Sequence, residues 1–148
     1  MGTREHEVIG TLVVERDIPL APRTTFHVGG AADFFCAARD PSELAAAVRF
    51  ARERSLAVTV LGGGSNVLMP DSGLRGLVIS IGLSGRQFRE VGGGAVEVRA
   101  AAGEAWDELV RECVSRGLWG LENLSGIPGL VGATPIQNVG AYGAEIGS

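Results

Sequence analysis

Apolar residues recur along this chain at two different spacings, which predict two kinds of secondary structure. In residues 40–53 and 104–116 they return at every third or fourth position, the spacing of one face of an α-helix. The first helix has Asp40 as its expected N-cap, followed by a proline, with Glu43 placed for a capping box. The second is expected to end at Gly117, which suits a left-handed C-terminal residue. The residues expected to face the core are Leu44, Ala47, Val48 and Ala51 in the first helix, and Trp106, Leu109, Val110, Cys113 and Val114 in the second.

Short segments between the helices are typical of β-strands, because they are rich in β-branched and aromatic residues or alternate between apolar and charged ones. The predicted strands cover residues 24–28, 31–38, 57–61, 76–81 and 95–101. Residues 1–22 are expected to be extended, with Pro19 and Pro22 breaking any regular element there.

The strand and helix pattern occurs twice, and each copy leads into a glycine-rich loop. This layout predicts an α+β domain of two small lobes, about residues 19–82 and 83–148, after an N-terminal lead-in of residues 1–18. From Gly120 onward glycine, proline and small polar residues dominate, and the pattern stops at Ser148 in the middle of a motif. The second lobe is therefore expected to be incomplete at its C-terminus.

The composition excludes several classes of function. The 148 residues have a net charge of −4, and all 13 basic residues are arginine. Without lysine there is no Walker A phosphate loop, no pyridoxal Schiff base and no lysine nucleophile. A net acidic chain without a basic run is a poor nucleic-acid binder.

The sequence also indicates a cytoplasmic location and no metal. Neither a signal peptide nor an apolar stretch of about 18 residues is present. Two histidines, His6 and His27, and two cysteines do not match metal-ligand spacing. Cys36 and Cys113 are expected to be buried free thiols, with a disulfide as the alternative.

The first glycine-rich loop directly follows a predicted strand and runs through Gly62, Gly63, Gly64, Ser65 and Asn66. Glycines allow several backbone N–H groups to approach one anion, and the two polar side chains add donors. The loop is therefore a candidate phosphate or pyrophosphate site that needs no lysine, with a simple tight turn as the alternative. It is not a Rossmann fingerprint, because Val67 takes the place of the last glycine and no helix pattern follows.

The second stretch, residues 127–143, combines small residues with two amides and the only tyrosine. Pro128 is expected just ahead of a short helix whose free N–H groups face an anion. Gln137, Asn138 and Tyr142 suit the mixed donors and acceptors of a flavin edge or ribityl chain. A loop-rich surface without a ligand is the alternative.

Structural roles are the expected ones for most of the remaining polar residues. His27 is expected to be a satisfied structural histidine rather than a ligand contact, and Glu122 with Asn123 either orients a ligand or satisfies loop backbone. Three arginines are expected to form a solvated face: Arg75, Arg86 and Arg89. The chain shows no Ser/His/Asp set and no paired-carboxylate motif.

From about Pro19 to the end, the sequence resembles the FAD-binding region of the UDP-N-acetylenolpyruvoylglucosamine reductase (MurB) family. The most specific part is the block from Gly120 to Gly143. The matching segments are Thr24 to Phe26, Gly29 to Asp33, Leu61 to Leu68, Ala102 to Glu104 with Trp106, Gly120 to Leu124, Ile127 to Gly129, Val131-Gly132, Pro135 to Asn138 and Gly140 to Gly143. The Pro-Ile-Gln-Asn sequence at residues 135–138 is similar to that of the first subtype of the family.

The resemblance implies an FAD-binding domain of the PCMH (vanillyl-alcohol-oxidase) type, with FAD between two α+β lobes. Gly62 to Asn66 would hold the pyrophosphate. Because Ser65 and Asn66 stand where some relatives carry a flavin-linking histidine, the FAD would be non-covalent. The residues that would line the flavin and ribityl side are Ile127, Pro128, Gly129, Val131, Gly132, Ala133, Gln137, Asn138, Gly140, Tyr142 and Gly143.

The resemblance also implies a reaction, in bacterial peptidoglycan (cell wall) synthesis and hence in cell shape and division. In the family, NADPH reduces the flavin, which reduces the enolpyruvyl group of UDP-N-acetylglucosamine enolpyruvate to UDP-N-acetylmuramate. A serine, assisted by an arginine and a glutamate, supplies the proton. None of these three is matched in this chain, so no catalytic residue is assigned and the chain alone is expected to be inactive.

Two other functions remain open at this point. The chain would also suit the FAD subunit of another PCMH-type oxidoreductase, which binds FAD but not UDP-sugars. A non-catalytic nucleotide-binding or partner-docking module is the third possibility.

Overall fold

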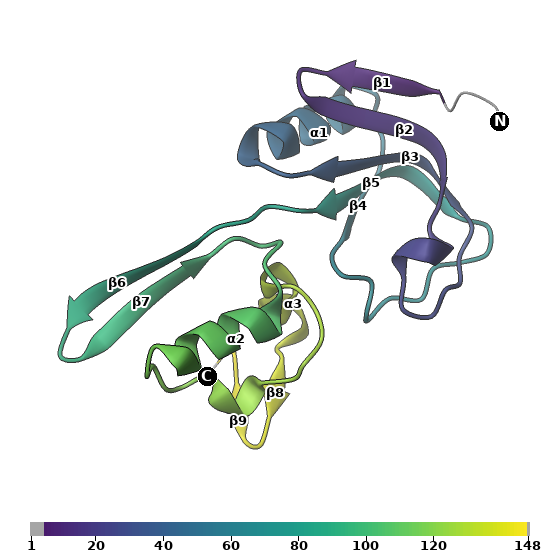
Figure 1. Ribbon diagram of the computed structural model, residues 1–148. Helices are drawn as coiled ribbons and strands as arrows, with labels where there is room; N and C mark the ends of the chain where they lie inside the picture. The colour runs from purple at the N-terminus through teal and green to yellow at the C-terminus, as the bar shows by residue number, and fades with distance from the viewer. Residues whose placement is uncertain (1–4, 148) are drawn as a thin grey trace. The chain divides into compact units, whose positions relative to one another are not determined.

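The computed structural model describes residues 5–147, and the chain divides into two compact units, residues 1–82 (unit 1) and 83–148 (unit 2) (Figure 1). Unit 1 is a five-stranded sheet with one helix. Its strands are β1 (His6–Ile9), β2 (Leu12–Pro19), β3 (Ala31–Ala38), β4 (Val58–Leu61) and β5 (Leu74–Ile81), in the order β1-β2-β3-β5-β4. The β1–β2 and β2–β3 pairs are antiparallel, whereas the β3–β5 and β5–β4 pairs are parallel.

The described part of the N-terminal segment is a β-hairpin rather than an extended lead-in. β1 pairs with β2, and β2 pairs with β3 along most of its length. Leu12 and Val14 alternate into the core on one face, and Gly10 takes a positive φ in the turn. Pro19 is compatible with this hairpin because it is the last residue of its strand. The apolar alternation therefore outweighs the prolines.

The strand predicted over residues 24–28 is also wrong. Residues 21–23 form the short 3₁₀ turn η1 (Ala21–Arg23), and the chain then folds back on itself. The buried Thr24 hydroxyl lies 3.3 Å from the carbonyl oxygens of both Ala21 and Val28. These local side-chain contacts compete with the extended conformation. His27 has a φ of 54° and is exposed.

Helix α1 (Pro41–Glu53) begins where its capping residues predict. The Asp40 carboxylate accepts from the N–H groups of Ser42 and Glu43 at 2.7 and 2.9 Å. The Ser42 hydroxyl and then the Glu43 N–H hold the pKa of Asp40 below its usual value. The Glu43 carboxylate bonds the N–H of Arg39, one residue before the cap, rather than the cap itself.

Each face of the sheet carries its own hydrophobic cluster. The first lies under α1 and includes Phe50, Cys36 and Ile79. Val48, expected in this core, is 49% exposed, because the buried face of the helix runs through Ala46 and Phe50 instead. Burial raises the pKa of the Cys36 thiol to about 11, which fits the predicted buried free thiol.

The second cluster lies on the opposite face and is covered by loops instead of a helix. Strand neighbours alternate between the two faces, so Phe35 and Val78 point to this side. Its other members are Ile18, Leu20, Ala32, Leu61 and Met69. The candidate phosphate loop belongs to this loop-covered side of unit 1.

The longer of the two α-helices of unit 2 packs between a long hairpin and a series of short turns. Its elements are β6 (Arg86–Gly92), β7 (Ala95–Ala100), α2 (Trp106–Ser115), η2 (Glu122–Leu124), η3 (Val131–Ala133), α3 (Thr134–Gln137), β8 (Gly140–Ala141) and β9 (Ala144–Glu145). The core contains Trp106, whose indole N–H donates to the Leu124 carbonyl oxygen at 2.9 Å. Val114, also expected there, is 53% exposed. Cys113 is a buried free thiol, as predicted.

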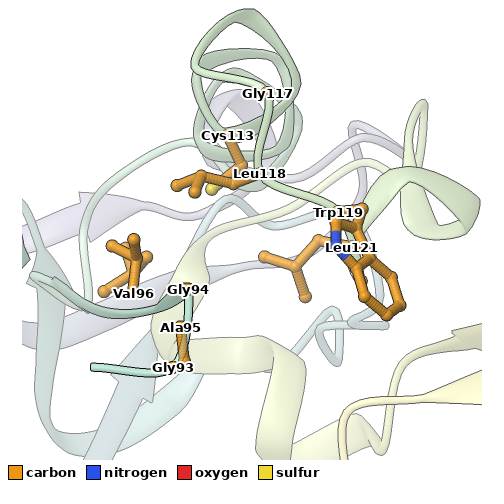
Figure 2. A pocket seen from close by; sticks show the side chains of 11 residues that line it. Gly93, Gly94, Ala95, Val96, Cys113, Gly117, Leu118, Trp119 and Leu121 are labelled. Carbon is orange, nitrogen blue, oxygen red and sulfur yellow. The ribbon is translucent and has the colours of Figure 1, made fainter. Parts of the chain in front are cut away.

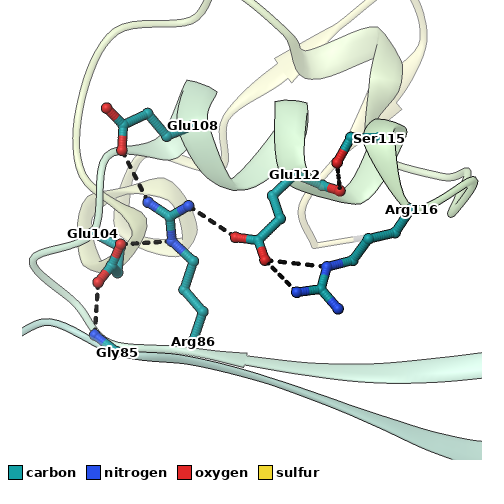
Figure 3. A network of polar contacts seen from close by, with 7 residues as sticks. All are labelled: Gly85, Arg86, Glu104, Glu108, Glu112, Ser115 and Arg116. Atoms are coloured by element: carbon teal, nitrogen blue, oxygen red, sulfur yellow. Dashed lines mark hydrogen bonds and ion pairs between the residues drawn. The ribbon is translucent and has the colours of Figure 1, made fainter.

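A polar network joins the hairpin to α2 and corrects the predicted solvated face (Figure 3). Only 18% of the Arg86 side chain is exposed, and its guanidinium bonds three carboxylates. The partners are Glu104 at 2.6 Å and Glu108 and Glu112 at 3.0 Å. Hydrogen bonds from Arg86 to these carboxylates, first of all Glu112, raise the pKa of the arginine. Arg75 and Arg89 are exposed as expected.

Candidate functional site

The candidate phosphate loop, residues 62–66, begins directly after β4. Leu61 lies beside Ser80 near the end of β5, and β5 itself starts at Leu74. Residues 62–73 therefore run back along the sheet, and Met69 inserts into the loop-covered cluster. The glycine loop is held over a packed surface rather than projecting freely.

Gly64 fixes the loop from its inner side. It is buried and has a φ of 71°, whereas Gly63 and Asn66 are exposed. A Cβ at Gly64 would lie 2.2 Å from the Arg23 carbonyl oxygen, and the Gly64 carbonyl accepts from the N–H of Thr25 at 2.9 Å. The loop thus turns Gly64 inward for close packing and presents Gly63 to solvent.

The segment that braces this loop was not among the predicted site residues. Arg23 contributes its carbonyl, while its guanidinium lies 4.0 Å above the Phe35 ring. Gly30 repeats the close packing further along, where its N–H donates to the Pro70 carbonyl at 2.9 Å. The sequence signals here were the Thr24–Phe26 and Gly29–Asp33 segments, which carry the family resemblance but no chemistry of their own.

The expected helix with free N–H groups after Pro128 is not present in that form. The helical turn begins at Val131, and all three of its N–H groups have backbone partners. Val131 donates to the Glu104 carbonyl at 2.8 Å, Gly132 to that of Ala102 at 2.9 Å, and Ala133 to that of Leu130 at 2.9 Å. The prediction fails because this loop pairs with residues 102–106, so these amides are not available to an anion.

Residues 134–147 form a compact module that carries most of the predicted flavin-side polar groups. Gln137 ends α3, and Asn138 follows with a φ of 44°. Strands β8 and β9 pair across Tyr142 and Gly143, whose φ values of 53° and 80° are those of a type I′ hairpin turn. The Tyr142 side chain is 91% exposed. The module thus presents Gln137 and Tyr142 to solvent.

Acidic residues near these loops serve the backbone. Glu122 accepts from the Gly120 N–H at 2.5 Å, which realises the structural one of its two predicted roles. Asp107 accepts from the Gly126 N–H at 2.6 Å, and this bond lowers the pKa of the carboxyl. Both carboxylates stabilise the chain leading into residues 127–133.

The predicted site residues thus form two groups, one in each unit. Residues 62–66 belong to unit 1, and residues 127–143 belong to unit 2. Within residues 5–147, no cluster of three or more metal-ligating side chains is present, and no helix is long and apolar enough to span a membrane.

A groove that the sequence did not indicate lies in unit 2, at the tip of the long hairpin (Figure 2). Its volume is about 720 Å³, and its walls come from residues 93–96, Val98, Cys113 and residues 117–121. Trp119 at its border is 91% exposed. None of the predicted cofactor residues lines it.

A family model described as an FAD binding domain matches residues 32–147. The chain belongs to this family of FAD-binding domains. The predicted α+β, PCMH-type fold is confirmed by the match and by the crystal structure of the MurB reductase from Thermus caldophilus. That structure superposes with a TM-score of 0.67 at 31% identity, covering 90% of this chain and 45% of the other.

The resemblance to the reductase family is confirmed by curated relatives. The UDP-N-acetylenolpyruvoylglucosamine reductase of Saccharopolyspora erythraea is 53% identical over 127 residues, which are 86% of this chain and 35% of the relative. That of Cutibacterium acnes is 49% identical over 149 residues, which cover 99% of this chain and 40% of the relative. The chain therefore spans about two fifths of these relatives or less.

Proposed function

We propose that this chain binds FAD non-covalently and forms the FAD-binding part of a UDP-N-acetylenolpyruvoylglucosamine reductase. The family match supports FAD as the ligand. The observation that carries the phosphate-site assignment is the geometry of residues 62–66. Gly64 braces the loop from inside, while Gly63 and Asn66 face solvent with no acidic side chain in the loop.

The two glycine-rich stretches suit different parts of a dinucleotide, the first its phosphates and the second its ring and ribityl chain. At residues 62–66, small exposed positions allow close approach of an anion to the backbone. In residues 131–133 the backbone N–H groups already have partners, and the partly buried apolar side chains Ile127, Leu130 and Val131 suit a ring better than a phosphate. Gln137 and Tyr142 add exposed hydrogen-bonding groups.

The whole reaction belongs to the proposal as well. When bound, FAD supplies hydride transfer, with NADPH as donor and UDP-N-acetylglucosamine enolpyruvate as acceptor, in the bacterial cytoplasm. Peptidoglycan synthesis, with its roles in cell shape and division, would be the process served. The names of the relatives support the substrate assignment. In this chain the named residues bind and orient, and none is assigned to proton transfer.

Replacing Gly63 with valine should weaken FAD binding at least about tenfold, because the exposed backbone of the loop would be shielded by a branched side chain. Flavin fluorescence titration of the 148-residue chain measures the affinity. Ser72→Val is the matched control, because Ser72 is exposed in the same 62–73 segment outside the glycine loop. Equal affinity in wild type and Gly63→Val would remove the phosphate assignment. Absence of any FAD binding by wild type would overturn the proposed function.

The chain with FAD bound should not consume NADPH when the UDP-enolpyruvyl sugar is added. No residue of this sequence matches the family's proton-donating serine or its arginine and glutamate partners. A general acid must lie within hydrogen-bond reach of its target. The reaction is measured by the loss of NADPH absorbance at about 340 nm. Turnover above that of free FAD would show that catalytic groups are present in this chain.

A further inference from the structure

Asn138 uses both atoms of its side-chain amide inside the module of residues 134–147. Its Nδ2 donates to the Glu145 carboxylate at 2.8 Å, and its Oδ1 accepts from the Gly147 N–H at 3.2 Å. A Cβ at Gly147 would lie 2.9 Å from Asn138 Oδ1, so glycine permits this approach. The amide therefore joins the end of α3 to both the second strand and the end of the hairpin.

The backbone around Asn138 makes the same connection. Its left-handed conformation, which Asn tolerates better than most residues, turns the chain out of α3. The Val139 N–H then donates to the Thr134 carbonyl at 3.0 Å, and the Ile146 N–H donates to the Val139 carbonyl at 3.0 Å. Gln137 precedes this junction, and Tyr142 lies at the tip of the hairpin that it holds.

We propose that Asn138 is a positioning residue for FAD and not one of its direct contacts. It holds the β8–β9 hairpin against α3, so that Gln137 and Tyr142 present their polar groups in a fixed arrangement to the flavin. This inference rests on the proposed FAD binding. Asn138 is exposed like Gln137 and Tyr142, but it differs from them because its amide already donates one hydrogen bond and accepts another within the chain.

Exchanging the two partners distinguishes positioning from direct contact. Asn138→Asp loses the donor and sets a carboxylate against that of Glu145. In Asn138→Asp/Glu145→Gln the amide and the carboxylate trade places, so one hydrogen bond between them is restored and an oxygen still faces the Gly147 N–H. Glu145→Gln alone is the control, since the Asn138 amide can still donate to the oxygen of glutamine.

We expect FAD affinity to fall about fivefold in Asn138→Asp, the loss of one hydrogen bond, and to return within about twofold of wild type in the double variant. Flavin fluorescence measures the affinity, and emission from the buried Trp106 checks that unit 2 is folded. A double variant as weak as Asn138→Asp would show that the amide itself contacts FAD and would overturn the proposal. Unchanged affinity in Asn138→Asp would overturn it as well.

A second measurement keeps this test separate from the proposed function. In the ligand-free chain, the NMR signals of the Gly147 N–H and the Asn138 side-chain amide should report the junction. We expect the Gly147 signal to shift in Asn138→Asp and to return toward its wild-type position in the double variant. If the Gly147 signal is rescued but wild type does not bind FAD, the proposed function and the positioning role both fail. The hydrogen bonds between Asn138, Glu145 and Gly147 would still be confirmed. Without the rescue, the positioning role fails even if wild type binds FAD.

Discussion

Arg86→Met should lower the free energy of unfolding of unit 2 by about 2 kcal/mol, less than removing one partner of a fully buried ion pair, because this network is only partly buried. Arg86 is 18% exposed, and Glu104 and Glu112 are 13% and 27% exposed. Without the guanidinium, these carboxylates lose their shared cation while remaining partly desolvated. The long methionine side chain retains much of the packing, so the loss reports mainly the charge network (Figure 3).

The pH dependence of this loss has a definite sign. In wild type the Gly85 N–H and then Arg86 lower the pKa of Glu104, and Arg116 and then Arg86 lower that of Glu112. A lowered carboxyl pKa contributes stability above its unfolded value of about 4.5, and the contribution disappears as pH falls through the folded pKa. Removal of Arg86 raises both values, so the difference between variant and wild type should be largest near neutral pH and shrink below about pH 4.5.

Trp106 provides the measurement, because it is 3% exposed in the core of unit 2. Urea unfolding followed by its emission, in a Trp119→Phe background, is compared near pH 7 and near pH 3. Arg89→Met is the control, since Arg89 lies on the same strand but is 69% exposed. Equal losses in the two variants, or a loss for Arg86→Met that does not shrink in acid, would contradict the role of the network.

Local signals in the sequence predicted much of the fold. Asp40 followed by Pro41 marks the start of α1, and the predicted strand over residues 31–38 coincides with β3. These features depend on neighbours within a few residues. The hairpin of residues 6–19 was missed because its stability comes from pairing with β3, which local prolines do not report.

In the candidate site, too, features set by residue type were predicted and features set by distant contacts were not. Its two glycine-rich stretches were recognised from residue type, but the partners of their N–H groups depend on distant segments. The amides of residues 131–133 bond residues 102, 104 and 130, and Gly64 of the candidate phosphate loop packs on the Arg23 carbonyl. Likewise Arg86 was expected to be solvated, because its three carboxylate partners lie 18 to 26 residues away.

Gly64→Ala should lower the free energy of unfolding of unit 1 by about 3 kcal/mol, the largest effect expected for one added methyl group in this loop. Part of the cost is the left-handed conformation, about 1–2 kcal/mol for a residue with a Cβ. The rest is steric, because the Cβ would lie 2.2 Å from the Arg23 carbonyl oxygen and 3.0 Å from Thr24 Cα. Both obstacles are backbone atoms, so no side-chain rotation can relieve the overlap.

Gly10→Ala separates these two contributions within the same unit. Gly10 has a φ of 62°, close to the 71° of Gly64, but a Cβ there meets no atom within 4 Å. Native-state hydrogen exchange of β3 and β5 amides measures both variants, since the two tryptophans lie in unit 2. Equal losses would mean that conformational strain alone explains the need for glycine. A larger loss for Gly64→Ala, accompanied by weaker FAD binding, would mean that close packing on residues 23–25 holds the loop in its binding shape.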